Sequence, residues 1–287
     1  MSNTVKNKPG LLKPILRKLW PSGDRNGPTI VFEGDSAYNH ITVMDNNGIR
    51  TMFLGQNADE AETSINIANP ESAVFEYPGM MLAALALAKN REILMLGLGG
   101  GFIPNIFKKH LPNHNLTVVE LDPLVAEIAE TYFWFKAEKN IKLVIKEGLE
   151  FISGAPNNAY DQIWLDAYGG EHIPEHLTTL DFLAIVQLKL APDGLLVQNL
   201  HQTAGEVYYR QLYQTQELFG APPLLFGGIH CANTIAMSLN SETKTLPTAD
   251  RELISAFEEF GETIGPYDLL DQVPKMLKLT LKPPRPF

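Results

Sequence analysis

Short apolar runs alternate with amphipathic segments from residue 76 to residue 240, and this alternation constrains the fold more than any other feature. Runs such as 91–99 and 116–122 are almost continuously apolar, which is typical of strands that are buried on both faces. The amphipathic segments between them have the length of helices that connect parallel strands. The pattern predicts a doubly wound α/β fold with a mostly parallel sheet.

The last two apolar runs of this region, 222–230 and 233–240, follow each other with almost no separation. A parallel connection needs a dozen or more residues, so there is no room for a crossover helix between these runs. We therefore expect one of the two strands to be antiparallel to the rest of the sheet.

Residues 28–75 predict a small β unit that precedes this sheet. Stretches with β-branched residues in partial alternation stand on both sides of Asn46, Asn47 and Gly48, which form a strong turn signal. The polar stretch 56–72 that follows predicts a loop.

The charge distribution bears on possible partners. The chain has 23 basic and 33 acidic residues, a net charge of −10, yet residues 1–27 hold six basic residues and one acid. The rest of the chain is therefore strongly acidic, which disfavours nucleic acid and favours cationic ligands. Within the basic arm, residues 11–20 form a short amphipathic piece interrupted by Pro14. This piece either touches an anionic surface or packs on the body of the protein.

Cysteine and histidine usage predicts no metal site. The single cysteine, Cys231, excludes a disulfide framework within the chain and is predicted to be a small core residue in a strand. His172 and His176 flank Pro174 in a loop, and this arrangement is not typical of zinc ligands. No apolar run approaches the roughly 18 residues of a membrane-spanning helix. We expect a cytoplasmic protein without stable membrane insertion.

A glycine-rich stretch from Leu96 to Gly101 lies between a predicted strand and a predicted helix. Glycines allow a sharp turn, a close approach of the backbone to a ligand, and N–H groups that point at it. Gly97 and Gly99 are therefore candidate ligand contacts. The spacing differs from the G-x-G-x-x-G of dinucleotide-binding proteins, and a tight turn without a ligand is the alternative.

Glu120 ends the next predicted strand, about 20 residues after the glycines. An acid at this place accepts hydrogen bonds from both hydroxyl groups of a ribose in folds that bind adenosine cofactors. The pair of signals predicts a nucleoside site. Asp122 needs no ligand role, because Asp122 followed by Pro123 is a good start for a helix.

Two further acids follow predicted strands. Glu147, with Gly148 after it, is placed to accept a hydrogen bond from an adenine amino group or to stabilise the first turn of a helix. Asp166 ends the fourth strand and either orients and deprotonates a nucleophile such as an amine or caps a loop. A capping box at Thr178 and Asp181 is expected to open the helix that comes next.

At these residues the sequence resembles the spermidine synthase (polyamine aminopropyltransferase) family, and most of all its divergent spermidine-synthase-like branch. The resemblance covers roughly residues 30–240 and implies the Rossmann-like sheet of class I S-adenosylmethionine methyltransferases, a preceding β unit and a homodimer. The stretches that carry it are FEYPGMM, ILMLGLGGG, VVELDP, KEGLEFI, DQIWLDAYGG with IPEHLTT, and LAPDGLLVQNL.

The resemblance also implies roles for individual residues. Asp166 matches the acid that orients and deprotonates the attacking amine, with Tyr168 beside it. The residues expected to bind the donor are Gly97, Gly99, Gly100, Glu120, Glu147 and Gly148. Glu147 stands where the family commonly has Asp. The residues expected to bind the acceptor are Glu76, Tyr77 and Glu171.

The sequence departs from the family at two acidic positions. Gly100 stands where the family has an Asp that grips the ammonium of decarboxylated S-adenosylmethionine, and Gly169 stands where a second Asp binds the acceptor. Each such charge-assisted hydrogen bond is worth about 1.5–3 kcal/mol. We therefore expect an acceptor other than putrescine. Acids elsewhere can compensate, and the candidates are Glu171, Asp59, Glu62 and Glu76.

The leading hypothesis is an enzyme that transfers an aminopropyl group from decarboxylated S-adenosylmethionine to a small cationic or amine acceptor. A methyltransferase that uses intact S-adenosylmethionine is the first alternative, since a loop of bare N–H groups at Gly100 tolerates the donor's carboxylate. A catalytically inactive nucleoside-binding homologue is the second. The expected division of the chain is a basic arm at 1–27, a small β-hairpin domain at 28–75, a Rossmann-like catalytic domain at 76–240, and a C-terminal helix and tail at 241–287.

Overall fold

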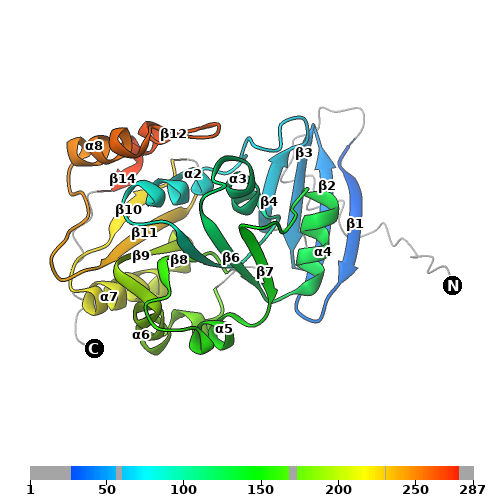
Figure 1. Ribbon diagram of the computed structural model, residues 1–287. Coiled ribbons are helices and arrows are strands. Elements are labelled where there is room, and N and C mark those ends of the chain that lie inside the picture. Colours follow the sequence, from blue (N-terminus) through cyan, green and yellow to red (C-terminus); the bar gives the residue numbers. More distant parts are fainter. Residues whose placement is uncertain (1–26, 56–59, 168–172, 230, 278–287) are drawn as a thin grey trace.

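The computed structural model describes residues 27–55, 60–167, 173–229 and 231–277. Within these residues an eight-stranded sheet forms the centre of the molecule, and a four-stranded antiparallel sheet lies beside it (Figure 1). In the part of the chain that is described, no helix is both long enough and apolar enough to span a membrane.

The large sheet has the strand order β14-β10-β11-β9-β8-β5-β6-β7. Strands β5 to β9 pair in parallel, β11 is antiparallel to β9, and β10 is antiparallel to β11. The predictions of a mostly parallel sheet and of one antiparallel strand near its end are confirmed. The strands are β5 (Glu92–Leu96), β6 (Asn115–Glu120), β7 (Ile141–Ile145), β8 (Tyr160–Leu165), β9 (Leu190–His201), β10 (Leu224–Gly227), β11 (Asn233–Asn240) and β14 (Met276–Leu277).

Helices cover both faces of this sheet, as β5 illustrates. Ile93 and Met95 point into the core shared with α2, α3, α4 and α8, whereas Leu94 and Leu96 point into the core shared with α5, α6 and α7. A strand with apolar side chains on both faces reads as a continuous apolar run, which is why the sequence pattern is so clear. The helices are α2 (Tyr77–Leu82), α3 (Phe102–His110), α4 (Pro123–Tyr132), α5 (Gly148–Gly154), α6 (Leu180–Lys189), α7 (Glu206–Phe219) and α8 (Asp250–Phe260).

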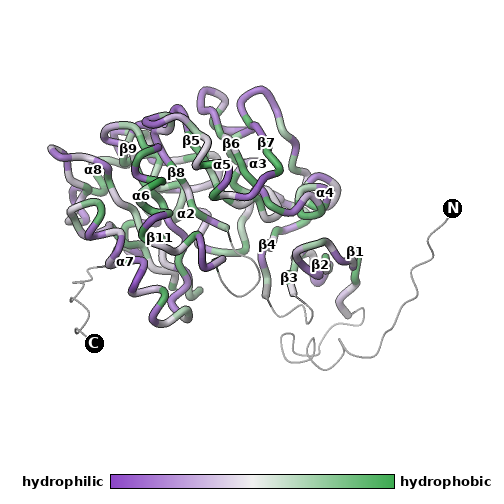
Figure 2. The backbone as a smooth tube through the Cα atoms, turned by 90° about the horizontal axis from the view of Figure 1, so that it is seen from below, coloured by the Kyte–Doolittle hydropathy of each residue, from purple (hydrophilic) through white to green (hydrophobic). Residues whose placement is uncertain are grey.

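The N-terminal sheet packs on α4 at one end of the molecule (Figure 2). Its strands β1 (Thr29–Asp35), β2 (His40–Asn46), β3 (Ile49–Leu54) and β4 (Glu60–Asn66) pair in chain order and antiparallel. Asn47 and Gly48 both have positive φ, as the turn signal predicted for the connection from β2 to β3. Phe32 of β1 contacts Tyr132 of α4 through their rings, with centroids 5.8 Å apart.

The prediction of a loop over the whole of residues 56–72 was wrong, because β4 lies within it. Thr63 and Ser64 of β4 are polar but buried, and the hydroxyl of each has a hydrogen-bond partner. The Ser64 hydroxyl is 2.8 Å from the Thr51 hydroxyl of β3, and the Thr63 hydroxyl accepts a hydrogen bond from Gly100. A strand with buried polar residues does not produce the apolar alternation from which strands are predicted.

Smaller expectations also need correction. The N-cap of α6 is Thr179, whose hydroxyl accepts from the Phe182 N–H, and not Thr178, which ends the short 3-10 turn η2 (Glu175–Thr178). Cys231 is half-buried against the core but precedes β11 and is not in a strand. Residues 241–277 hold more than one helix, because α8 is followed by β12 (Thr263–Ile264), β13 (Tyr267–Asp268), the 3-10 helix η4 (Leu270–Lys275) and β14.

Candidate active site

A cavity lies beyond the carboxyl ends of the parallel strands β5 to β8. In doubly wound folds this end of the sheet is where ligands bind. Six residues that the sequence singled out from separate strand ends line this one cavity: Gly97, Gly99, Glu120, Glu147, Gly148 and Asp166. The fold therefore brings the glycine loop, the nucleoside-binding candidates and the candidate base together.

The glycine loop packs closely against its surroundings, and Gly97 and Gly99 combine this packing with a positive φ. Gly97 has φ of +102°, and a Cβ there would lie 2.1 Å from the backbone oxygen of Asp166. Gly99 has φ of +53°, and its Cβ would lie 2.8 Å from the hydroxyl of Thr63. Glycine is required at both positions because no other residue combines this conformation with such close contacts.

Gly100 has a different environment from its neighbours. It is buried beneath β4, its N–H donates to Thr63 Oγ1 at 2.8 Å, and it is not among the described residues that line the cavity. A Cβ at Gly100 would lie 2.6 Å from Thr63 Cγ2 and 3.0 Å from the ring of Phe133. The space that a side chain at position 100 would need is thus filled by β4 and by the residue after α4.

Glu120 holds the glycine loop to the end of β6. One carboxylate oxygen accepts from the Leu98 N–H at 3.0 Å and the other from the Asp122 N–H at 2.8 Å. Burial raises the pKa of Glu120, and these backbone hydrogen bonds oppose that rise. A carboxylate has about four lone-pair sites, so two hydrogen bonds leave capacity for ribose hydroxyl groups.

Glu147 caps α5, as one of its two sequence interpretations proposed. Its carboxylate accepts from the N–H groups of Leu149 at 3.0 Å and Glu150 at 2.7 Å. His176 Nε2 lies 2.9 Å from the same carboxylate. Burial alone would raise the pKa of Glu147, but the hydrogen bonds outweigh burial, and the pKa is lowered. An ionised carboxylate therefore stands at this end of the cavity.

Asp166 is a cavity acid whose pKa is raised towards neutrality. Desolvation raises its pKa to about 7, although a hydrogen bond from Asn199 acts in the opposite direction. Asn199 Nδ2 donates to Asp166 Oδ1 at 2.7 Å, and Asn233 Nδ2 donates to Asn199 Oδ1 at 2.9 Å. A carboxylate with a pKa near neutrality is suited to accept a proton at physiological pH.

Other predicted residues do not join this group. Glu76 lies at the start of α2, 3.9 Å from Lys275 Nζ, and Tyr77 stacks on Phe75 with ring centroids 6.2 Å apart. Neither is among the described residues that line the cavity. Tyr168, Gly169 and Glu171 lie outside the described residues.

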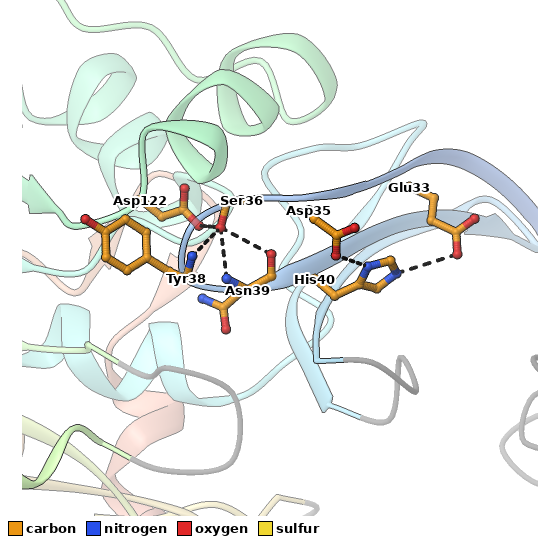
Figure 3. Close-up of polar contacts among 7 residues, drawn as sticks. All are labelled: Glu33, Asp35, Ser36, Tyr38, Asn39, His40 and Asp122. Carbon is orange, nitrogen blue, oxygen red and sulfur yellow. Dashed lines mark hydrogen bonds and ion pairs between the residues drawn. The ribbon is translucent and has the colours of Figure 1, made fainter. Parts of the chain in front are cut away.

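The cavity wall also contains Tyr38 and Asn39, which sequence reasoning missed. They follow β1 in a turn that Ser36 fastens to α4 (Figure 3). The Ser36 hydroxyl donates to Asp122 Oδ2 at 2.5 Å and accepts from the N–H groups of Tyr38 and Asn39. Asp122 therefore has a second role besides capping α4, because it anchors the N-terminal sheet at the cavity. No sequence signal linked Ser36 to an acid 86 residues later.

Glu62, Lys146 and His176 also line the cavity. The sequence indicates Glu62 only as one of several acids that can compensate for the acids missing at Gly100 and Gly169, and it indicates His176 only as a histidine in a loop. Lys146 pairs with Glu150 at 2.9 Å on the first turn of α5. The local sequence of these residues has no special pattern, so their place at the site depends on tertiary structure.

Comparison with known proteins identifies the family. The spermine/spermidine synthase domain matches residues 75–218, half of the chain. The chain belongs to the spermine/spermidine synthase family. The resemblance to the spermidine synthase family that the sequence motifs indicated is thereby confirmed.

Relatives named aminopropyltransferase and relatives named methyltransferase both match parts of this chain. A polyamine aminopropyltransferase from Vibrio vulnificus is 33% identical over 197 residues, which are 67% of this chain and 66%, just under two thirds, of that protein. A human eEF1A lysine and N-terminal methyltransferase is 31% identical over 144 residues, or 44% of this chain and 21% of that protein. A spermidine synthase solved with the transition-state analogue AdoDATO has a TM-score of 0.70 at 17% identity, covering 88% of this chain and 85% of that one. The last match confirms the fold.

Proposed function

We propose that this protein transfers an aminopropyl group from decarboxylated S-adenosylmethionine to an amine acceptor other than putrescine. The observation that carries the proposal is one cavity that contains the glycine loop, Glu120 and the near-neutral acid Asp166. A nucleoside site and a proton acceptor are what an alkyl transfer from a sulfonium nucleoside to an amine requires.

The donor fits the residues of the cavity. Glu120 offers its remaining lone pairs to the ribose hydroxyl groups, and the backbone at Gly97 and Gly99 lets the nucleoside approach closely. Glu147 and Gly148 stand at the end of the cavity where the adenine is expected. The anionic side chains of the site also favour a sulfonium ion.

The acceptor is activated at Asp166. The amine nitrogen attacks the carbon next to sulfur, the carbon–sulfur bond breaks, and its electron pair stays on sulfur, which becomes a neutral thioether. The carboxylate of Asp166 takes the proton that the amine loses. Most of the rate enhancement is expected from alignment, since a sulfonium is already a good leaving group.

Three N–H groups of the glycine loop already have acceptors within the protein. The N–H of Gly97 donates to the Val119 oxygen, that of Leu98 to Glu120, and that of Gly100 to Thr63. Because these N–H groups donate to acceptors within the protein, they are not available to the carboxylate of an intact donor. The N–H of Gly100 is therefore not bare, and it gives no reason to favour an intact donor.

A methyltransferase remains the second candidate function. Two observations favour it: position 100 lacks the family's ammonium-binding acid, and three relatives carry the name of a methyltransferase. Under this alternative the same cavity holds intact S-adenosylmethionine, and the nucleophile attacks the methyl carbon.

Calorimetric titration of the purified chain with each donor tests the proposal. We expect tighter binding of decarboxylated S-adenosylmethionine, followed by turnover with one member of a panel of di- and polyamines. Tighter binding of the intact donor would favour the methyltransferase. Binding without turnover would favour the inactive nucleoside-binding homologue, and absence of binding to either donor would overturn the proposal.

The resemblance supports further roles that complete this proposal. They are contacts of Tyr168 near the reacting atoms, acceptor contacts of Glu76, Tyr77 and Glu171, and a homodimer. Sedimentation of the full chain tests the dimer directly. A cytoplasmic location and the four-part division of the chain also stay predictions.

A further inference from the structure

A carboxylate from β4 lies over the glycine loop, next to the position where the family's ammonium-binding acid is missing. Glu62 lines the cavity together with Gly97 and Gly99. Its Oε1 is 3.6 Å and its Cγ 3.8 Å from the point where a Cβ of Gly99 would stand. The side chain of Glu62 therefore borders the space that a side chain at Gly99 would enter.

The same strand explains why position 100 has no acid of its own. Thr63, the neighbour of Glu62, occupies the space above Gly100, where a Cβ would lie 2.6 Å from Thr63 Cγ2. Its hydroxyl also accepts the Gly100 N–H. Within β4, Thr63 thus excludes a side chain at position 100, and the preceding residue, Glu62, brings a carboxylate to Gly99.

The other acids of the cavity have different positions and partners. Glu120 and Glu147 each accept two backbone N–H groups, at the ends of β6 and β7. Asp122 caps α4 and accepts from Ser36. Asp166 follows β8 and is the proposed base. Glu62 is the acid that reaches the cavity from the N-terminal sheet, on the Gly99 side.

We propose that Glu62 determines donor specificity by binding the ammonium of the donor's aminopropyl arm. This inference rests on the proposed function, because it names the residue that recognises the decarboxylated donor. An ionised carboxylate forms a charge-assisted hydrogen bond with an ammonium and repels the carboxylate of intact S-adenosylmethionine. Glu62 thereby selects for one donor and against the other.

The test compares Glu62→Gln with wild-type protein in calorimetric titrations against three ligands. They are decarboxylated S-adenosylmethionine, intact S-adenosylmethionine, and 5′-methylthioadenosine, which has the nucleoside but no ammonium. We expect Glu62→Gln to weaken binding of the decarboxylated donor by about tenfold or more, in line with the loss of one charge-assisted hydrogen bond. Binding of 5′-methylthioadenosine is expected to change by less than about twofold, and discrimination against the intact donor is expected to fall.

Two further variants sharpen the result. Glu33→Gln removes a carboxylate from β1 of the same sheet, outside the residues that line the cavity, and is expected to bind all three ligands like wild type. Glu62→Asp keeps the charge on a shorter side chain and is expected to retain more of the donor preference than Glu62→Gln. Circular dichroism spectra and thermal midpoints establish that each variant is folded.

The outcomes separate this inference from the proposed function. If the wild type prefers the decarboxylated donor and Glu62→Gln keeps that preference, the role of Glu62 is wrong while the proposed function stands. If the wild type binds 5′-methylthioadenosine but prefers the intact donor, both fail, although the nucleoside site remains. If the wild type binds none of the three ligands, the nucleoside site itself is wrong.

Discussion

At the scale of single residues, the environment of Asp166 decides what the site can do. A carboxyl group in water has a pKa near 4 and is a weak base, whereas desolvation in this cavity raises the pKa of Asp166 to about 7. Asn199 limits this rise because it donates a hydrogen bond that stabilises the ionised form. Asp166 follows β8 and Asn199 lies in β9, so the effect of Asn199 on the pKa of Asp166 depends on the pairing of β8 with β9.

This pKa predicts the pH dependence of the reaction. The proposed base is the ionised form of Asp166, which predominates above its pKa, so kcat/KM is expected to rise with pH and to level off above about 7. Asp166→Asn is expected to lower kcat by roughly 10²–10⁴-fold and to abolish this inflection. Donor affinity should stay within a few-fold of wild type. A pH profile of Asp166→Asn with the wild-type inflection would assign the titration to another group, such as the amine substrate.

Asn199 is predicted to be a positioning residue that acts through Asp166. Asn199→Ala removes the hydrogen bond that lowers the pKa of Asp166, so the inflection of kcat/KM is expected to move to higher pH. Asn240→Ala is the matched control, because Asn240 ends β11 and contacts the backbone of Leu190 and Ala191 instead. Loss of activity in Asn199→Ala without a displaced inflection would indicate a structural role alone.

At the scale of elements, the contact between β4 and the glycine loop shapes the donor side of the cavity. Thr63 accepts the Gly100 N–H, and Glu62 lies beside Gly99. The turn after β1 adds a second contact through Ser36 and Asp122. The N-terminal sheet therefore forms part of the cavity wall.

Gly100→Ala tests how closely these two elements are packed. The added methyl group would lie 2.6 Å from Thr63 Cγ2 and 3.0 Å from Phe133, so β4 must shift. We expect the free energy of unfolding to fall by about 1–3 kcal/mol, as for other overpacked sites. Urea denaturation measures this change. Gly154→Ala at the end of α5 has nothing within 4 Å of its Cβ and is expected to be neutral or slightly stabilising. Equal stabilities of the two variants would contradict the packing described for β4.

At the scale of the whole molecule, charge favours the proposed substrates. The net charge is −10, and residues 28–287 are more negative than this total because the N-terminal arm is basic. Such a field attracts a cationic donor and a cationic acceptor over distances comparable to the screening length, about 10 Å at 0.1 M salt.

The predicted consequence is a dependence of kcat/KM on ionic strength. We expect kcat/KM for a polyamine acceptor to decrease as salt is added, because screening removes the long-range attraction. Binding of the uncharged 5′-methylthioadenosine, measured over the same salt series, is expected to stay nearly constant. If kcat/KM for the polyamine and the affinity for 5′-methylthioadenosine decline in parallel, salt acts on the protein in general and the long-range attraction is not the cause.

Much of the fold follows from local sequence patterns. Strand β5 is a continuous apolar run because helices cover both faces of the sheet, and the neighbouring parallel strands contain shorter apolar stretches. The acids Glu120, Glu147 and Asp166 follow such runs directly, and parallel strands bring their carboxyl ends to one edge. Local spacing was therefore enough to predict that these residues meet, and likewise to predict the turn at Asn47 and Gly48.

The remaining features depend on contacts between residues that are distant in the chain. Only pairing with β3 and the contact with Gly100 make a strand of the polar β4 segment. Only the pairing of β14 with β10 places the C-terminal segment at the edge of the large sheet. The hydrogen bond of Asn199 to Asp166 and the approach of Glu62 to the loop likewise join separate elements. The sequence by itself determined the strands and their terminal acids, because apolar periodicity is local. The tertiary structure decided which polar residues surround them, because those partners are set by packing over long separations.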